Sequence, residues 1–182
     1  MKRCIVIGII ILACFLLQST LFHYFELAGV VPNLLLIVTM SFGLMRGRRE
    51  GLLVGFFSGL LIDIFFGQYL GPYAFIYMTL GYGNGFFHRI YYVEDVLLPM
   101  LMISINDFLY NFIIYVIFFM LKNKLDFSIY MTKIILPEMI YTILITLFLY
   151  KILVRINLRL KRVKEAETIW EYAIFCERLK NL

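Results

Sequence analysis

Long apolar runs, interrupted by short polar or basic blocks, recur along almost the whole chain. An apolar stretch of about 20 residues forms a helix long enough to cross a lipid bilayer. Six apolar runs predict helical spans at about 4–22, 27–45, 51–66, 72–87, 96–121 and 129–154. The connections between the runs are short, which favours antiparallel neighbours. The pattern therefore predicts an all-α, polytopic integral membrane protein with six transmembrane helices and no inserted soluble domain.

The second run contains Pro32 near its start. A helix counted only from Asn33 is about 20 Å long, which is shorter than the roughly 30 Å hydrocarbon core. Two alternatives stay open. Either the element begins before Pro32 and is bent there, or the bilayer thins around a short helix.

A regular glycine spacing marks the third run. Gly51, Gly55 and Gly59 recur every four residues, and Asp63 follows at the same interval. On a helix this spacing places the glycines and the carboxylate on one face. Small residues let a neighbouring helix approach closely, and an acid on an apolar helix is expected to face protein rather than lipid. The spacing predicts the packing centre of a helix bundle. Together with Gly81 and Gly85, these glycines are expected to form a groove for a neighbouring helix or for a helix of a partner protein.

The overall composition agrees with a membrane protein. Hydrophobic residues make up 63% of the 182 residues, charged residues only 16%, and the mean hydropathy is +0.90. Soluble domains are closer to half apolar and carry more charge. The net charge of +5 invites a nucleic-acid interpretation, but the basic residues stand in short blocks between apolar runs. Membrane topology explains these blocks, so we expect the lipid bilayer and not nucleic acid as a partner.

The basic residues also predict an orientation. Of the 17 lysines and arginines, all except Lys122, Lys124 and Lys133 fall on one side of the predicted spans. Basic residues are enriched in cytoplasmic segments. Both termini are therefore predicted to be cytoplasmic. The residues expected at the inner membrane surface are Arg46, Arg48, Arg49, Arg159, Lys161, Arg162 and Lys164.

The last part of the chain differs in character from the rest. We divide the sequence into a transmembrane domain, 1–154, and a basic amphipathic cytoplasmic tail, 155–182, whose apolar residues recur at helical spacing. The tail either lies on the anionic inner leaflet or docks a cytosolic partner, or it is a solvated extension of the sixth helix. The sequence leaves these alternatives open.

Three carboxyl groups lie inside predicted spans. Counted along the helices, Asp63, Asp107 and Glu138 are about 18, 16 and 14 Å from the start of their spans. This predicts a midplane polar cluster, to which Asn106 and Asn111 can contribute hydrogen bonds. Such a cluster either binds a polar ligand or moves protons, or it is a clasp that holds the third, fifth and sixth helices together. No basic residue lies at that depth, and we favour the clasp.

Residues for catalysis or cofactor binding are not recognisable in the sequence. The three cysteines have no metal-ligand spacing, the serines within spans have no histidine at matching depth, and no phosphate-binding glycine loop is present. We therefore expect neither a bound cofactor or metal nor an enzymatic activity.

One family shares the most distinctive part of the chain. Pro32-Asn33 before a basic turn, the glycine repeat that ends at Asp63, and then Gly67 and Gly71 resemble the rod shape-determining protein family MreD. The later Gly81 and Gly85, the six spans and the basic tail are similar as well. Members often carry aspartate where this chain has Asn33, a substitution that keeps the helix-capping chemistry. Spans five and six are matched only by hydropathy.

The resemblance implies a non-enzymatic, multi-pass protein of the bacterial cytoplasmic membrane that belongs to the cell-elongation machinery. Its implied partners are MreC, the actin-like MreB and the peptidoglycan glycosyltransferase and transpeptidase pair. Whether the chain forms a homodimer stays open.

The family's fold is similar to the substrate-binding S components of energy-coupling-factor transporters. This supplies an alternative function, binding of a vitamin or metal for transport. An S component typically shows small residues on its first helix, where this chain offers only Gly8 and Ala13 at the wrong spacing. A second alternative, an intramembrane enzyme, lacks a nucleophile and base pair.

Overall fold

The computed structural model describes residues 2–21, 30–67, 69–90, 97–118 and 131–180, with side chains left out at 2–3, 21, 118 and 161–180. The described residues are helical, which confirms the all-α prediction. The six α-helices are α1 (Lys2–Leu16), α3 (Leu34–Arg46), α4 (Arg48–Phe66), α5 (Pro72–Asn84), α6 (Leu97–Phe118) and α8 (Leu136–Lys180). Three short helical turns accompany them, the π-helical η1 (Leu17–Leu21) and η4 (Met131–Ile135) and the 3₁₀ turn η2 (Gly85–Arg89).

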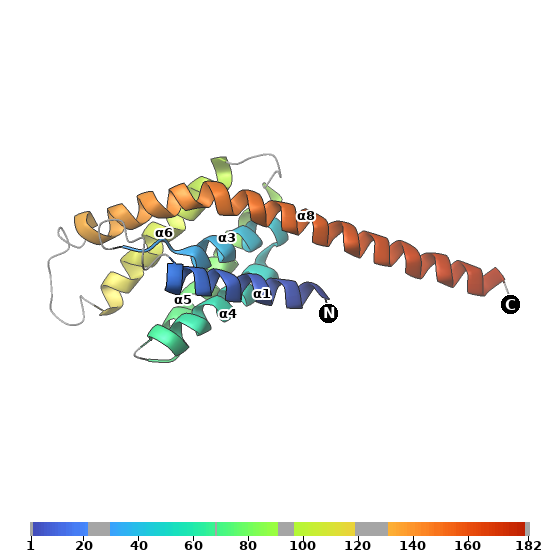
Figure 1. The fold of residues 1–182 in the computed structure, drawn as a ribbon, viewed down its shortest axis with the longest axis horizontal. Helices are drawn as coiled ribbons and strands as arrows, with labels where there is room; N and C mark the ends of the chain where they lie inside the picture. The colour runs from blue at the N-terminus through green and yellow to red at the C-terminus, as the bar shows by residue number, and fades with distance from the viewer. Residues whose placement is uncertain (1, 22–29, 68, 91–96, 119–130, 181–182) are drawn as a thin grey trace.

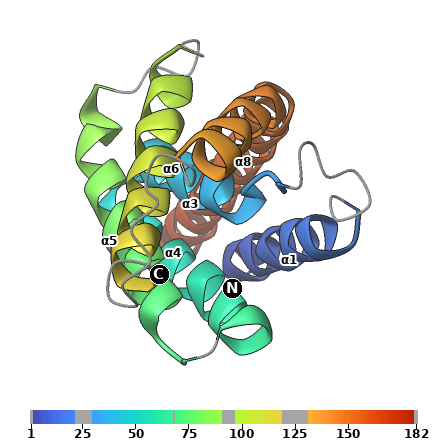
Figure 2. The same cartoon turned by 90° about the vertical axis from the view of Figure 1, so that its left-hand side faces the viewer.

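Helix α3 is the centre of the molecule. Every residue from Leu34 to Met45 is buried, and α3 contacts each of the other five α-helices. Figure 2 shows α3 in the middle, with α1, α4, α5, α6 and α8 around it. A helix that is apolar on all sides is stable only where every side is covered by apolar surroundings. Here the protein itself supplies that cover.

The start of α3 differs from the predicted span 27–45. The helix begins at Leu34, with Asn33 as its N-cap, so Pro32 precedes the helix and does not bend it. Residues 27–29 of that predicted span lie outside the described residues. With 13 residues, α3 is about 20 Å long. It is therefore shorter than a hydrocarbon core, as the second of the two alternatives requires.

Two glycines with left-handed backbone geometry set the tight connections around α4. Gly47 has φ +91° and is the single residue between α3 and α4. Gly71 has φ +117° and directly precedes α5. A side chain is strained in this region of φ, so both turns require glycine. The two turns return α4 and then α5 against α3.

Helix α8 passes through the predicted boundary at 154–155 without a break. Its 45 residues give a length of about 68 Å, more than twice the hydrocarbon thickness. Figure 1 shows the second half of α8 extending beyond the bundle, with both chain ends on the same side. The described part of the predicted tail thus continues the sixth α-helix, as in the helical-extension alternative. The side chains of Lys161, Arg162 and Lys164 lie outside the described residues.

Helices α6 and α8 turn polar groups inward and apolar groups outward. On α8, Thr142, Thr146 and Tyr150 are buried, whereas the stripe Ile140, Leu144, Phe148 and Ile152 is exposed. On α6, Asp107 and Asn111 are buried, whereas Leu101, Ile105 and Phe112 are exposed. This is the reverse of a soluble amphipathic helix. By length and composition, Leu97–Ile117 and Met131–Leu160 can each cross a membrane, while Cys4–Thr20 and Leu34–Arg46 are shorter apolar helices.

Candidate functional site

The glycines of α4 form a face against which α5 lies in backbone contact. A Cβ at Gly51 would overlap the carbonyl oxygen of Gly81, and one at Gly55 would overlap that of Tyr77. A Cβ at Gly59 would overlap the carbonyl of Tyr73 and the backbone of Ala74. The α4–α5 contact is the most extensive among the described elements. Because α5 fills this glycine face, the face is closed to a helix of another protein.

Glycines on the α5 side complete the same contact. A Cβ at Gly81 would overlap the carbonyl of Gly51, and one at Gly85 would overlap the backbone of Arg48. The five glycines therefore follow the α4–α5 pair along its length. Close backbone approach of this kind maximises van der Waals contact between helices.

Asp63 caps the N-terminus of α5. One carboxyl oxygen accepts from Tyr73 N–H at 3.1 Å and the other from Ala74 N–H at 2.8 Å. These N–H groups belong to the first turn of α5, where no partner exists within the helix. Pro72 occupies the first position and lacks an N–H, so the carboxylate serves the next two donors. The buried acid is thereby matched to a helix N-terminus.

The contacts of Asp63 among the described residues do not include Asp107 or Glu138, with which it was predicted to form one cluster. Asp63 lies three residues before the end of α4 and is bound to the adjacent start of α5. The depth count assumed that all three acids lie at the middle of their spans. Two backbone N–H groups are also better partners for a carboxylate than two further acids are.

Asn33 joins three helices at the start of α3. Its side-chain oxygen accepts from Leu36 N–H at 3.1 Å and from the Tyr77 hydroxyl at 2.6 Å. Its own N–H donates to the Thr142 hydroxyl on α8 at 3.3 Å. From the turn after α1, Gln18 accepts from Leu35 N–H at 3.2 Å. The buried N-terminus of α3 is thus satisfied by side chains from the elements around it.

Asp107 and Glu138 do lie close together, beside the Asn33 site. The Glu138 carboxyl interacts with the Asn111 side chain and faces Asp107. Asn111 also donates to the Asp107 carbonyl oxygen at 3.1 Å. Asp107 faces Thr142, yet neither carboxyl oxygen has a hydrogen-bond partner among the described residues, although the residue is only 1% exposed. These residues form a polar contact between α6 and α8.

Asn106 belongs to a separate contact. Its amide donates to the Met102 carbonyl at 2.6 Å and reaches the Asn84 side chain at 3.5 Å. Asn84 in turn donates to the Met40 carbonyl at 3.1 Å, so this contact joins α6, α5 and α3.

Four residues that form these polar contacts between helices were not singled out from the sequence, namely Gln18, Tyr77, Asn84 and Asn157. Asn84 could have been found as a polar amide within an apolar run of the sequence.

The basic residues of the α3–α4 turn contact α8 and η2. Arg46 donates to the Asn157 side chain at 2.6 Å and lies 3.5 Å from the Glu50 carboxylate. Arg48 lies over the Phe86 ring, 4.1 Å from its centroid. A ring nitrogen of His88 is 2.6 Å from the Leu44 carbonyl oxygen. The end of α3, the start of α4, η2 and the middle of α8 therefore meet at one end of the bundle. Lys122 and Lys124, predicted for the other end, lie outside the described residues.

The Asn33 site leads to a ranked stability prediction. Asn33→Ala removes the cap of α3 and the acceptor of the buried Tyr77 hydroxyl, for a loss of about 3 kcal/mol. Tyr77→Phe keeps the Leu36 contact and is expected to cost about 1 kcal/mol. Denaturant unfolding of the purified protein in detergent, followed by helical circular dichroism, measures both changes. An equal or larger loss for Tyr77→Phe would contradict the assigned role of Asn33.

The described helices define a class of all-helical protein with apolar outer faces, a glycine-packed helix pair and basic residues gathered at one end. The chain belongs to the rod shape-determining protein MreD family, whose model matches residues 2–160. The match covers all six described α-helices except the last part of α8. No curated protein and no solved structure matches the chain. Family membership gives the protein a role in determining rod shape, and together with the apolar helices it indicates a membrane protein.

Proposed function

We propose that the protein is a non-enzymatic, six-span scaffold in the bacterial cytoplasmic membrane. In this proposal it links MreC and cytoplasmic MreB to the peptidoglycan glycosyltransferase and transpeptidase pair. The observation that carries the proposal is the family match over residues 2–160. The function is then mechanical, because the bundle holds partners in fixed positions relative to the membrane.

The reversed polarity of α6 and α8 supports the membrane placement. Exposed apolar stripes several turns long are uncommon on monomeric soluble proteins, whereas lipid requires them. Thr142 and Asn111 face inward, where protein groups can satisfy them. A bilayer around the bundle explains why each of these helices exposes apolar side chains and buries polar ones.

The clustered basic end supports an orientation with both termini in the cytoplasm. Arg46 and Asn157 place the α3–α4 turn beside the stretch of α8 that precedes Arg159. An excess of basic residues at one end of a bundle agrees with the positive-inside rule. The continuation of α8 would then carry its basic residues toward anionic lipid and the cytosol, where MreB resides.

Purification from native membranes, with identification of the proteins that copurify, tests the proposal. We expect MreC to be recovered in near-stoichiometric amount from a gently solubilised sample. Recovery of transporter ATPases without MreC would overturn the scaffold and favour an S component. Depletion of the protein in a rod-shaped host is expected to give rounded cells, and retention of rods would count against the proposal.

A further inference from the structure

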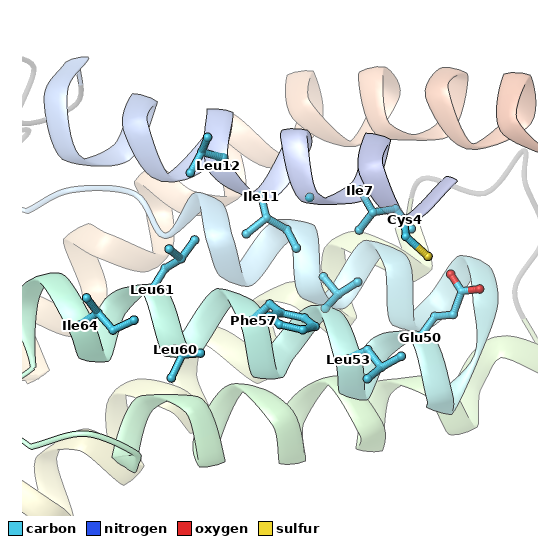
Figure 3. A pocket seen from close by; sticks show the side chains of 12 residues that line it. Cys4, Ile7, Ile11, Leu12, Glu50, Leu53, Phe57, Leu60, Leu61 and Ile64 are labelled. Carbon is cyan, nitrogen blue, oxygen red and sulfur yellow. The ribbon is translucent and has the colours of Figure 1, made fainter. Parts of the chain in front are cut away.

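A groove of about 800 Å³ lies between α1 and α4, apart from the glycine face and from the polar contacts of Asn33, Asp107 and Asn106. Figure 3 shows its walls, with Ile11 and Leu12 from α1 opposite Phe57 and Ile64 from α4. The lining is apolar except at one end, where Cys4 and Glu50 lie. A polar ligand would find no partners along most of this groove, so the groove suits an apolar occupant.

The length and the apolar lining of the groove suit alkyl chains. Along α4 the lining runs from Glu50 to Ile64, which is about 21 Å at 1.5 Å per residue. Alkyl chains are about 5 Å across, since nonbonded carbons approach to about 4 Å, so they can lie along a groove of this length.

The polar end of the groove is suited to an anion. The N-terminal ends of α1 and α4 both point to this end, as Cys4 and Glu50 show in Figure 3. Helix N-termini favour negative charge. Arg49 lies one turn before the lining residue Leu53 and therefore on the same stripe of α4.

Arg49 is the basic side chain of this turn that is left to meet a ligand. Arg46 binds Asn157 and the Glu50 carboxylate, and Arg48 lies over Phe86. Within the described ranges, Arg49 is exposed and has no hydrogen bond or ion pair. The charge of Glu50 is offset by Arg46, so the mouth of the groove stays net basic.

We propose that the α1–α4 groove binds the acyl chains of an anionic phospholipid of the cytoplasmic leaflet, with the lipid phosphate at Arg49. The inference rests on the proposed membrane placement and orientation. The groove length of about 21 Å exceeds the roughly 15 Å of one leaflet's share of the hydrocarbon core, so acyl chains can lie along it for their full extent. The lipid would fill the space between the two helices and so fix α1 against the bundle.

Gly8 and Gly83 offer a matched pair of variants. A Cβ at either glycine meets nothing within 4 Å, so a side chain can start at both positions without a clash. Gly8 lines the groove, whereas Gly83 is on α5 and does not. Gly8→Leu therefore fills the groove, and Gly83→Leu adds the same side chain elsewhere.

Native mass spectrometry of the protein extracted in mild detergent measures the retained lipid, with phosphatidylglycerol and phosphatidylethanolamine supplied as competing probes. Gly8→Leu is expected to lower phosphatidylglycerol retention about tenfold, because displacing even two buried methylenes costs that much affinity. Gly83→Leu should retain lipid like the unaltered protein. Arg49→Gln should keep lipid binding but lose the preference for phosphatidylglycerol.

Unchanged retention in Gly8→Leu would overturn the inference, as would a folded, unaltered protein that carries no phospholipid. A photoreactive residue at position 57 identifies the occupant directly. An adduct with a second copy or another protein's helix, in place of a lipid adduct, would also defeat it. Lipid retention without recovery of MreC would instead defeat the proposed scaffold and leave the lipid site intact.

Discussion

Gly55→Ala is expected to destabilise the bundle by about 2 kcal/mol, although alanine is the better helix former. The added methyl would overlap the Tyr77 carbonyl and the backbone that follows it. A backbone cannot rotate away as a flexible side chain can, so α5 must move as a whole. Overpacking of this kind typically costs 1–3 kcal/mol, which exceeds the gain of about 1 kcal/mol in helix propensity.

Gly83→Ala is the matched control on α5. Its methyl meets nothing within 4 Å, so only the propensity gain remains. We expect this variant to be as stable as the unaltered protein or up to about 1 kcal/mol more stable. Free energies of unfolding for the two variants, measured by denaturant titration in the same detergent, check the prediction. Equal effects at the two positions would mean that helix propensity, and not the close approach of α5, sets the outcome.

The glycine spacing could be interpreted from sequence because it is a local property. Three glycines at intervals of four must share a helix face, whatever surrounds the helix. The short connection after Phe66 also made the following helix a natural antiparallel neighbour. What the spacing could not show was that α5 occupies the whole face and leaves none of it for a partner.

The central position of α3 was beyond the reach of a single sequence. A helix that is apolar all round is equally suited to lipid and to a protein interior, because both are apolar. The capping of α3 depends on Gln18 and Thr142, which are 17 and 109 residues from their partners. No periodicity links residues so far apart. Asn33 was recognisable as a cap because capping is again local.

Asp63→Leu is expected to destabilise the protein by about 3 kcal/mol. Asp63 is only 2% exposed. The variant removes the carboxylate that accepts from the Tyr73 and Ala74 N–H groups at the start of α5. A lost cap costs about 0.5–2 kcal/mol, and each buried unpaired donor adds about 1–3 kcal/mol if no water reaches it. Unfolding measured by the loss of helical signal in denaturant gives the difference.

Asp63→Asn removes one acceptor oxygen but keeps a side chain of nearly the same size, so it tests the hydrogen bonds apart from the packing. Asparagine keeps one oxygen and turns an amide toward the second N–H, so we expect a loss of about 1–2 kcal/mol, between the unaltered protein and Asp63→Leu. The same substitution at Asp107 is the control, since neither carboxyl oxygen there has a hydrogen-bond partner among the described residues. Asp107→Asn should therefore cost less than Asp63→Asn. If the two asparagine variants lose equal stability, burial of the acid matters more than the α5 cap. If only Asp63→Asn is costly, this acid stabilises the bundle by completing a helix, and the glycine face and its carboxylate are two parts of one α4–α5 contact.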